Sequence, residues 1–459
     1  MTVSLEPSPS ISFTLPLMKC LIIAAGKGSR LKQKGDCKPL IHLLGVPLIE
    51  RVIRSAIEAG ADDFYAVSGY QGGRVRAFLD DLSACLRIQI THIINKDWEK
   101  ENGLSVLKAR EHLHEPFLLI MADHLFDPAI ARKLMSFSLD DGEIALAVDE
   151  DTQNPFINME DVTRVKTNGK KIYNIGKSIS DFNGFDTGIF FCSPAIFSAL
   201  DQSAEKQNNI SLSGVGRILA NKSRFKAVKI NGLFWIDVDD PTSFHRAENA
   251  LLSNLSKHTD GFVSKYLNRP ISLRISRHLF LKTDISPNFI SLFSFLLSLL
   301  GAFFFFLGGY ASLVIGGILA QVSSVIDGCD GEVARLKYKS TDFGGWFDAV
   351  LDRYADGFLL FALTYYVCVS NDSFVLAFFV GFLALIGTFM NSYTADKYDG
   401  LMKQKLGYEK FYFRMGRDTR MFIIFLGAMV NQPLFTLALI ALITNMENIR
   451  RVFVLYKNG

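Results

Sequence analysis

The hydrophobic pattern divides the chain into two unlike parts. Up to about residue 260 short apolar runs alternate with amphipathic segments, and beyond about residue 287 the chain is mostly apolar. In the first part, residues 19–25 form an apolar run that ends in glycine turns, which predicts a buried parallel strand. Residues 47–60 predict a helix, and further strands are predicted at 64–68, 88–94 and 117–121. This alternation favours an α/β doubly wound domain up to about residue 245.

The flanking segments set the expected domain boundaries. Residues 1–17 lack the basic start and long apolar stretch of a signal peptide, and we expect a disordered extension there. The α/β domain is then expected over 18–256, with a closing helix at 247–256. Residues 257–286 should hold a linker and an interfacial amphipathic helix, because 262–282 mixes apolar with basic side chains.

An all-α membrane domain is expected over 287–459. Its hydrophobic segments are approximately 287–307, 311–333, 343–369, 373–394, 417–431 and 433–450. A span needs about 20 apolar residues, so the fifth segment is short. Lys and Arg occur in every second connection and in the C-terminal tail. Because basic loops stay in the cytoplasm, this alternation predicts a multi-pass protein of the cell (inner) membrane with six helices and both termini cytoplasmic.

Charge and cysteine content exclude some functions. The net charge of +3 is too small to indicate a nucleic-acid partner. The 6 cysteines are scattered without C-x-x-C or zinc-ligand spacing, which indicates reduced thiols in a protein whose working parts face the cytosol.

Four aspartates stand out in the apolar part: Asp327, Asp330, Asp348 and Asp352. Carboxylates are costly in hydrocarbon, so an intramembrane cluster indicates a functional site. The spacings of three and four residues place each pair on one face of its helix. Converging carboxylates repel one another unless cations lie between them, which predicts a two-metal site suited to phosphoryl chemistry, with Mg²⁺ as the ion and Mn²⁺ as the alternative.

The residues around these aspartates carry further signals. Gly331 and Arg335 are suited to contact a pyrophosphate, because an arginine presents a planar fork to phosphate oxygens. Gly344 and Gly345 allow close helix approach. The competing structural interpretation pairs the aspartates with basic residues on other helices, but too few bases are nearby to neutralise them.

A glycine-rich turn follows the first predicted strand. In AAGKGSRL, Gly26 and Gly28 let backbone amides approach a triphosphate, and Arg30 and Lys38 offer charge to its oxygens. The segment lacks the third glycine of a dinucleotide fingerprint and the GK[ST] ending of a P-loop, so alone it is weak support for nucleotide binding.

Two aspartates at strand ends strengthen the nucleotide hypothesis. Asp123 in MADH and Asp237 in WIDVDD both follow strand-like runs, where ligands bind in open α/β sheets. Two carboxylates could hold one Mg²⁺ against phosphates. The alternative for either residue alone is a helix cap or a turn.

These soluble-domain motifs together resemble the sugar-phosphate nucleotidyltransferase family. The resemblance implies attack by a phosphomonoester on the α-phosphate of an NTP, with pyrophosphate expelled. It implies that Gly26, Gly28, Ser29 and Arg30 hold the triphosphate with help from Lys38, and that Asp123 and Asp237 are metal ligands. Lys177 would contact the phosphate of the acceptor, with a solvated lysine as the alternative, and Asp186 would help to shape the acceptor pocket.

The membrane segment resembles the CDP-alcohol phosphotransferase family. The matching positions are Asp327, Asp330, Gly331, Ala334, Arg335, Gly344, Asp348 and Asp352. The resemblance implies a CDP-linked donor bound at Gly331, Ala334 and Arg335, attack by an acceptor hydroxyl on the β-phosphate, and release of CMP. The four aspartates would ligate metal, and Asp352 would also accept the hydroxyl proton.

A basic cluster near residue 417 has two interpretations. Arg414, Arg417 and Arg420 fall on the predicted cytoplasmic side, as the aspartates do. They are suited to bind either the phosphate of an acceptor or lipid headgroups. Asp356 lies one turn beyond the signature and is expected to support it rather than to react.

The order of the two halves resembles the family of bifunctional inositol-1-phosphate cytidylyltransferases and di-inositol-phosphate-phosphate synthases. That resemblance implies CTP and inositol 1-phosphate as substrates, CDP-inositol as intermediate, a second inositol phosphate as acceptor, and both active sites facing the cytoplasm. It also implies a homodimer in contact with membrane lipid. A lipid alcohol acceptor, another polyol phosphate, and a non-catalytic anchor or transporter remain as alternatives.

Overall fold

The computed structural model describes residues 18–206, 210–230, 232–255, 261–370, 374–406 and 415–458. The chain forms two compact units, Met1–Asn249 and Ala250–Gly459. The extension expected at 1–17, most of the expected linker and Arg414 lie outside the described residues.

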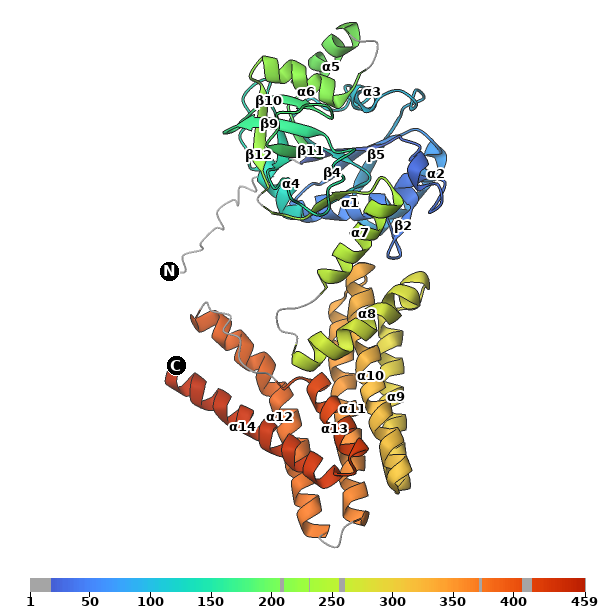
Figure 1. Ribbon diagram of the computed structural model, residues 1–459, viewed down its shortest axis with the longest axis vertical. Coiled ribbons are helices and arrows are strands. Elements are labelled where there is room, and N and C mark those ends of the chain that lie inside the picture. The colour runs from blue at the N-terminus through green and yellow to red at the C-terminus, as the bar shows by residue number, and fades with distance from the viewer. Residues whose placement is uncertain are drawn as a thin grey trace, which may run out of the picture. The chain divides into compact units, whose positions relative to one another are not determined.

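The first unit is built on a mixed sheet with strand order β5-β4-β1-β6-β11-β8-β12-β10-β9 (Figure 1). The strands are β1 (Lys19–Ala24), β4 (Asp63–Ser68), β5 (Gln89–Ile94), β6 (Phe117–Met121), β8 (Ile144–Asp149), β9 (Arg164–Asn168), β10 (Lys171–Gly176), β11 (Gly184–Cys192) and β12 (Phe225–Lys229). Strands β5, β4, β1 and β6 run parallel, and β11 runs antiparallel to β6 and β8. The predicted parallel strands are therefore present, within a sheet that is mixed rather than wholly parallel.

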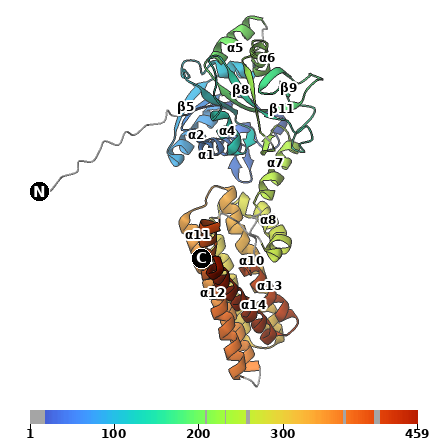
Figure 2. The ribbon, with the colours of Figure 1, turned by 90° about the vertical axis from the view of Figure 1, so that its left-hand side faces the viewer.

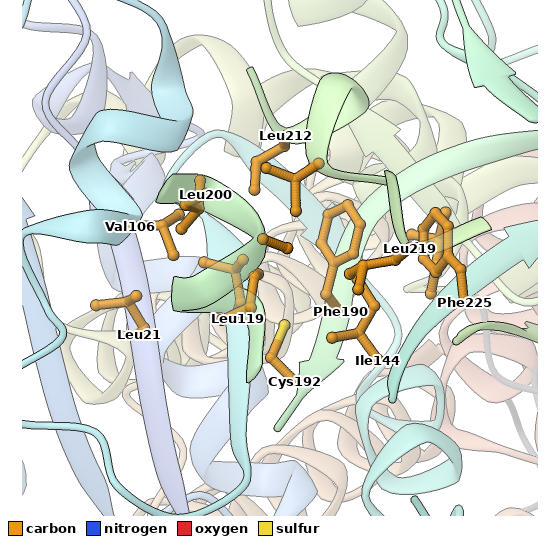
Figure 3. Packing of buried hydrophobic residues seen from close by; sticks show 14 of the residues in the cluster. Leu21, Val106, Leu119, Ile144, Phe190, Cys192, Leu200, Leu212, Leu219 and Phe225 are labelled. Atoms are coloured by element: carbon orange, nitrogen blue, oxygen red, sulfur yellow. The ribbon is translucent and has the colours of Figure 1, made fainter. Parts of the chain in front are cut away.

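Helices cover both faces of this sheet. Figures 1 and 2 show α1 (Leu48–Ala59), α2 (Gly72–Leu86) and α4 (Pro128–Met135) on one face. On the other face lie α3 (Asn102–Leu107), α5 (Ala195–Lys206) and α6 (Leu212–Asn221). There Leu119 and Phe190 of the sheet pack against Leu200 and Leu219 of the helices (Figure 3). The core thus holds the strands rigidly, and their ends carry the site.

Two short strand pairs sit beside the main sheet. One is β2 (His42–Leu43) with β3 (Val46–Pro47), and the other is β7 (His124–Phe126) with β13 (Trp235–Asp237). The antiparallel register of the second pair sets Asp237 opposite His124. Helix α7 (Pro241–Ser253) follows β13 and begins at Pro241 rather than at 247 as expected. Asp240 caps it, accepting from Thr242 N and Ser243 N.

The second unit is helical. It begins with η3 (Ser264–Asn268), α8 (Arg269–His278) and η4 (Phe280–Lys282), where the amphipathic helix was expected. Then come α9 (Pro287–Leu307), α10 (Tyr310–Leu336), α11 (Asp342–Ser370), α12 (Phe374–Leu406), α13 (Arg417–Met429) and α14 (Pro433–Asn458). Helices α9, α10, α11 and α13 agree with the predicted segments to within about three residues at each end. Helices α12 and α14 begin as predicted but run past the predicted ends at residues 394 and 450.

Three of these helices are long and apolar enough to cross a membrane among the described residues. They are α9, α10 and the part of α12 from Phe374 to Ala395. Helix α13 has 13 residues, fewer than the roughly 20 that a span needs, and α11 carries several aspartates. The unit therefore has the character of a membrane domain, and the crossing by all six helices stays a prediction.

Small residues let the first two of these helices pack closely. A Cβ on Gly316 of α10 would lie 2.8 Å from the carbonyl oxygen of Gly301 on α9, so Gly316 has no room for a larger residue, and a Cβ on Gly301 would lie a tight 3.1 Å from the carbonyl oxygen of Gly316. Three buried serines of α9 donate hydrogen bonds to the same neighbour: Ser291 to Asp330, Ser294 to Asp327 and Ser298 to Ser323.

Candidate active sites

The glycine-rich turn of the first unit has the geometry that a phosphate cradle needs. It follows β1, and Gly28 there has a φ of 62°, a conformation that favours glycine. A Cβ on Gly28 would overlap the side chain of Lys38, whereas a Cβ on Gly26 would meet nothing within 4 Å. Gly28 is therefore required for Lys38 to pass beneath the turn, and Gly26 leaves the approach to the turn open.

Lys38 lies at the centre of the charged groups. Its side chain is buried and makes ion pairs with Asp123 and Asp239. Burial alone would lower the pKa of Lys38, but Asp123 and Asp237 outweigh it and the pKa is raised, so the lysine stays charged. Arg30 pairs with Asp161 and lies 3.3 Å from Asp239. The two cations that follow the turn are thus both paired with carboxylates of the site.

Asp123, His124 and Asp237 form a group that could hold a metal ion. Their ligand atoms all lie within 4.8 Å of one another. One oxygen of Asp237, Oδ1, is buried and has no hydrogen-bond partner among the described residues. His124 Nδ1 lies 2.9 Å from Asp123 Oδ1 and 3.8 Å from Asp237 Oδ1. The carboxylates fit a hard divalent ion such as Mg²⁺, which takes a few carboxylates together with substrate oxygens.

The titration of this group follows from its burial and charge. Burial would lower the pKa of His124, but Asp237 and Asp123 raise it to about 9, so the ring is charged at neutral pH and the two carboxylates are the groups suited to ligate a metal ion. For an acid the effect of burial has the opposite sign, and burial raises the pKa of Asp237 to about 6. For Asp123 the charge of Lys38 and the contact with His124 overcome burial, and its pKa is lowered. Asp123 is therefore ionised at neutral pH and ready to ligate a cation.

A cavity of about 220 Å³ opens beside this group. Lys177 and Asp186 line it together with Asp237, so the expected acceptor residues share one cavity with an expected metal ligand. Lys177 Nζ lies 2.5 Å from Asp161 Oδ1. Asp186 accepts a hydrogen bond of 2.7 Å from Gly188 N, and burial raises its pKa to about 6. The cavity walls therefore combine charged groups such as Lys177 with apolar side chains such as Phe156 and Trp235, a mixture that suits a ligand with both polar and apolar surface.

In the second unit, Asp327, Asp348 and Asp352 form a similar group. Their ligand atoms lie within 4.8 Å of one another, with Asp327 on α10 and the other two on α11. Asp348 Oδ1 is buried and has no hydrogen-bond partner among the described residues. Asp330 is not within that group, and it accepts from Ser291 and from Gly331 N. The donor set is all carboxylate, which fits Mg²⁺ or Mn²⁺.

Arg417 lies across this group. Its Nη1 is 2.7 Å from Asp327 Oδ1 and 2.6 Å from Asp352 Oδ1. Arg420, one turn further along α13, instead pairs with Asp356 at 2.5 Å, and both of those side chains are buried. The predicted basic cluster is therefore divided: Arg417 belongs to the aspartate group, Arg420 to an inner pair, and Arg414 lies outside the described residues.

Gly331, Ala334 and Arg335 lie on the last turns of α10. A Cβ on Gly331 would lie 3.2 Å from Arg335 Nη1, so the guanidinium folds back over the glycine. This places the arginine fork over Gly331, the residue that follows Asp330 on the same helix.

Comparison with known proteins covers both units. Residues 20–217 match the MobA-like NTP transferase domain, and residues 284–448 match the CDP-alcohol phosphatidyltransferase family. The protein of Aquifex aeolicus called "Bifunctional IPC transferase and DIPP synthase" is 33% identical over 444 residues, which is 95% of this chain and 98% of that protein. The chain belongs to this family of bifunctional IPC transferases and DIPP synthases.

Two further similarities were found. The protein of the same name from Rubrobacter xylanophilus is 32% identical, and the match covers 95% of each chain. The solved structure of the inositol-1-phosphate CTP transferase from T. maritima shares 26% identity with a TM-score of 0.45, covering 50% of this chain and 91% of that one. Both families that match generally use divalent metals, in line with the two carboxylate groups described above.

Some of the residues that line these candidate sites were missed in the sequence. Asp161 pairs with Arg30, Asp239 pairs with Lys38, and His124 lies within reach of both Asp123 and Asp237. Asp239 had a local signal, since it stands in the acidic run that follows Trp235. Asp161 had none, because it lies in a long connection between β8 and β9 and meets Arg30 only in the folded chain.

Proposed function

We propose that the chain carries out two consecutive reactions. In the first unit, inositol 1-phosphate attacks the α-phosphate of CTP, giving CDP-inositol and pyrophosphate. In the second unit, the inositol phosphate group passes from CDP-inositol to a second inositol phosphate, and CMP leaves. The observation that carries the proposal is that both units, in this order, match bifunctional relatives over 95% of the chain, each unit with its own carboxylate group.

In the first unit, catalysis would rest on positioning of the two substrates and on neutralisation of the phosphate charge. We assign the CTP phosphates to the turn at Gly26, Gly28 and Ser29, with Arg30 and Lys38 supplying positive charge. Asp123 and Asp237 would hold Mg²⁺, which would neutralise the phosphates. The phosphate of the incoming inositol would meet Lys177, and no covalent intermediate is needed because the attacking phosphate oxygen is already ionised.

In the second unit, the donor would bind at the last turns of α10, with its pyrophosphate at Gly331, Ala334 and Arg335. The four aspartates would hold the divalent ions that neutralise that pyrophosphate. Asp352 would accept the proton of the attacking hydroxyl while the bond to CMP breaks.

The direct test of the proposal is product analysis with the purified full-length protein. Incubation with CTP, Mg²⁺ and inositol 1-phosphate should give pyrophosphate first and CMP later, with a mass corresponding to two inositol units joined by phosphates. Glycerol phosphate in place of inositol phosphate is the matched control for the polyol. Pyrophosphate without CMP would contradict the second reaction and favour a membrane anchor or transporter.

A lipid alcohol acceptor is the second candidate, because the active helices belong to a membrane domain. An assay with labelled CDP-inositol distinguishes the two acceptors. A water-soluble product supports inositol phosphate as the acceptor, and a product extracted into organic solvent supports a lipid alcohol.

Arg417 gives a residue-level test of the acceptor. We propose that it binds the phosphate of the acceptor, because its side chain already lies between two carboxylates of the reacting group. Arg417→Ala should raise the acceptor KM about tenfold or more, more than it raises the donor KM. An unchanged acceptor KM would leave a lipid-headgroup role for this residue.

We further propose that the protein is a homodimer of the cell (inner) membrane, crossing it with six helices and with both active sites on the cytoplasmic side. The alternation of basic connections supports this orientation. Labelling of single engineered cysteines in intact cells and in lysed cells would test each connection.

A further inference from the structure

One buried carboxylate in the membrane domain is not used by the proposed chemistry. Glu332 lies on α10 between Gly331 and Ala334, at a position that the aspartate signature leaves unspecified. Its side chain is fully buried, with an exposed fraction of 0%. A buried carboxylate is costly unless it is hydrogen-bonded and paired, so its partners show what it does.

Among the described residues, three partners of Glu332 come from the helix that precedes the membrane segments. Ser272 Oγ donates to Glu332 Oε1 at 2.6 Å, and Ser276 Oγ donates to Oε2 at 2.7 Å. Arg269 Nη1 lies 3.2 Å from Oε1 and completes the pair. Arg269, Ser272 and Ser276 are three and four residues apart, so they form one face of α8, which lies beside α10 (Figure 1).

The opposite side of α10 is fixed in the same way. Ser291 and Ser294 of α9 donate to Asp330 and Asp327. Helix α10 is therefore held by serine–carboxylate contacts on two faces. The α9 face orients Asp327 of the metal group and the nearby Asp330, and the α8 face orients the turn that carries Gly331 and Arg335.

A second contact fixes the end of the same turn. Lys337 is buried, and its Nζ lies 3.3 Å from the carbonyl oxygen of Phe280 and 2.5 Å from that of Thr283. Glu332 and Lys337 thus hold α10 against the segment 269–283 on both sides of Arg335.

An apolar residue at position 332 would pack the two helices at least as stably, since a buried ion pair contributes little net stability. What the carboxylate adds is a fixed register, because its two oxygens accept from two serines one turn apart. A slide or rotation of α10 against α8 would break both bonds at once.

We propose that Glu332 is a positioning residue for the second reaction, which holds Gly331 and Arg335 in place for the pyrophosphate of the CDP-linked donor. The inference rests on the proposed function of the membrane domain. It predicts that α8, which contributes no residue to the aspartate signature, controls the affinity for the donor.

The test uses two full-length variants. Glu332→Gln keeps the volume and one acceptor oxygen but removes the charge that faces Arg269. Ser272→Ala with Ser276→Ala removes both hydroxyl donors and leaves every residue of α10 unchanged. Each should raise the KM for CDP-inositol about tenfold, because a small displacement of a positioning group has effects of that order, while the acceptor KM stays within about twofold.

The matched control is Glu447→Gln. Glu447 is also a buried carboxylate, paired with Arg450 and Arg451 on its own helix α14, away from the proposed donor turn. It should lower the unfolding temperature without changing the donor KM. The cytidylyltransferase rate of each preparation, which depends on the first unit, standardises the amount of active protein.

The outcomes separate the inference from the proposed function. The inference is overturned if the donor KM is unchanged both in Glu332→Gln and in the double serine variant. It is also overturned if Glu447→Gln raises the donor KM equally, because the effect would then come from a general loss of stability. If the unaltered protein releases no CMP, the proposed second reaction fails. Calorimetric binding of CDP-inositol then still tests the inference, because Glu332→Gln should weaken binding about tenfold and unchanged binding would refute it.

Discussion

The two carboxylate groups differ in how the chain brings them together. In the membrane domain, Asp348 and Asp352 are four residues apart on α11, and Asp327 reaches them from the neighbouring helix. In the first unit, Asp123 and Asp237 lie far apart in sequence and meet only because β7 pairs with β13. Helical spacing is local and appears in the sequence, whereas strand pairing is a property of the fold.

They also differ in how their charge is balanced. Lys38 is buried among the acids of the first unit, with Arg30 beside them, so that site carries its own cations. In the membrane group Arg417 faces Asp327 and Asp352, while an oxygen of Asp348 has no partner among the described residues. The membrane group should therefore depend more strongly on divalent ions, both for activity and for stability.

The largest expected effect comes from Asp352→Asn. The amide ligates metal poorly and accepts no proton, so CMP release from supplied CDP-inositol should fall by about a thousandfold or more. Pyrophosphate release from CTP and inositol 1-phosphate by the same protein should be unchanged. Persistent CMP release would show that Asp352 takes no part in the chemistry.

Lys38→Ala is the reciprocal variant, with a somewhat smaller expected effect. It removes the cation that pairs with Asp123 and Asp239, so pyrophosphate release should fall by about a hundredfold or more. CMP release from supplied CDP-inositol should stay at the level of the unaltered protein. Lys100→Ala, which removes an exposed lysine, is the matched control. Loss of both reactions would indicate that the two sites are not independent.

These contrasts explain what the sequence could predict. The apolar segments placed α9 at its observed bounds, because hydrophobic length alone determines a span. The start of α7 was predicted too late, since the Asp240–Pro241 capping signal was not weighed against the later apolar residues. Asp161 was missed because it contacts Arg30 across a connection with no regular pattern.

Divalent ions should stabilise the membrane group measurably. In EDTA, Asp348→Asn should unfold at a temperature about 2 to 4 °C above that of the unaltered protein, because it removes one of three adjacent negative charges. Millimolar Mg²⁺ should raise the unfolding temperature of the unaltered protein and raise that of the variant less. Asp342→Asn, an exposed change at the start of the same helix, should behave as the unaltered protein does. If Mg²⁺ raised the unfolding temperature equally in the unaltered protein, Asp348→Asn and Asp342→Asn, the assignment of Asp348 as a ligand would be refuted.

The smallest effect concerns pH and Asp186 in the first unit. Burial, opposed by the hydrogen bond from Gly188 and by His124, raises its pKa from 3.8 to about 6. Between pH 4 and 6 the folded protein therefore holds a proton that the unfolded chain has lost, so its stability falls as pH rises through this window. Asp186→Asn removes that penalty. Because the side chain is partly exposed, we expect the free energy of unfolding to rise by about 1 to 2 kcal/mol at neutral pH and to stay unchanged near pH 4.

Heat inactivation would measure this change. The readout is the fraction of cytidylyltransferase activity that remains after a heat pulse, relative to an unheated sample. The variant should outlast the unaltered protein at pH 7.5, and the two should converge toward pH 4. Asp181→Asn, on an exposed side chain nearby, should show no such divergence. A difference in residual activity between Asp186→Asn and the unaltered protein that stays constant across the pH range would contradict the raised pKa of Asp186. It would also remove a distinction between the sites, because in the first unit a buried carboxylate can relieve its cost by binding a proton. Three adjacent carboxylates that hold a divalent ion must remain ionised.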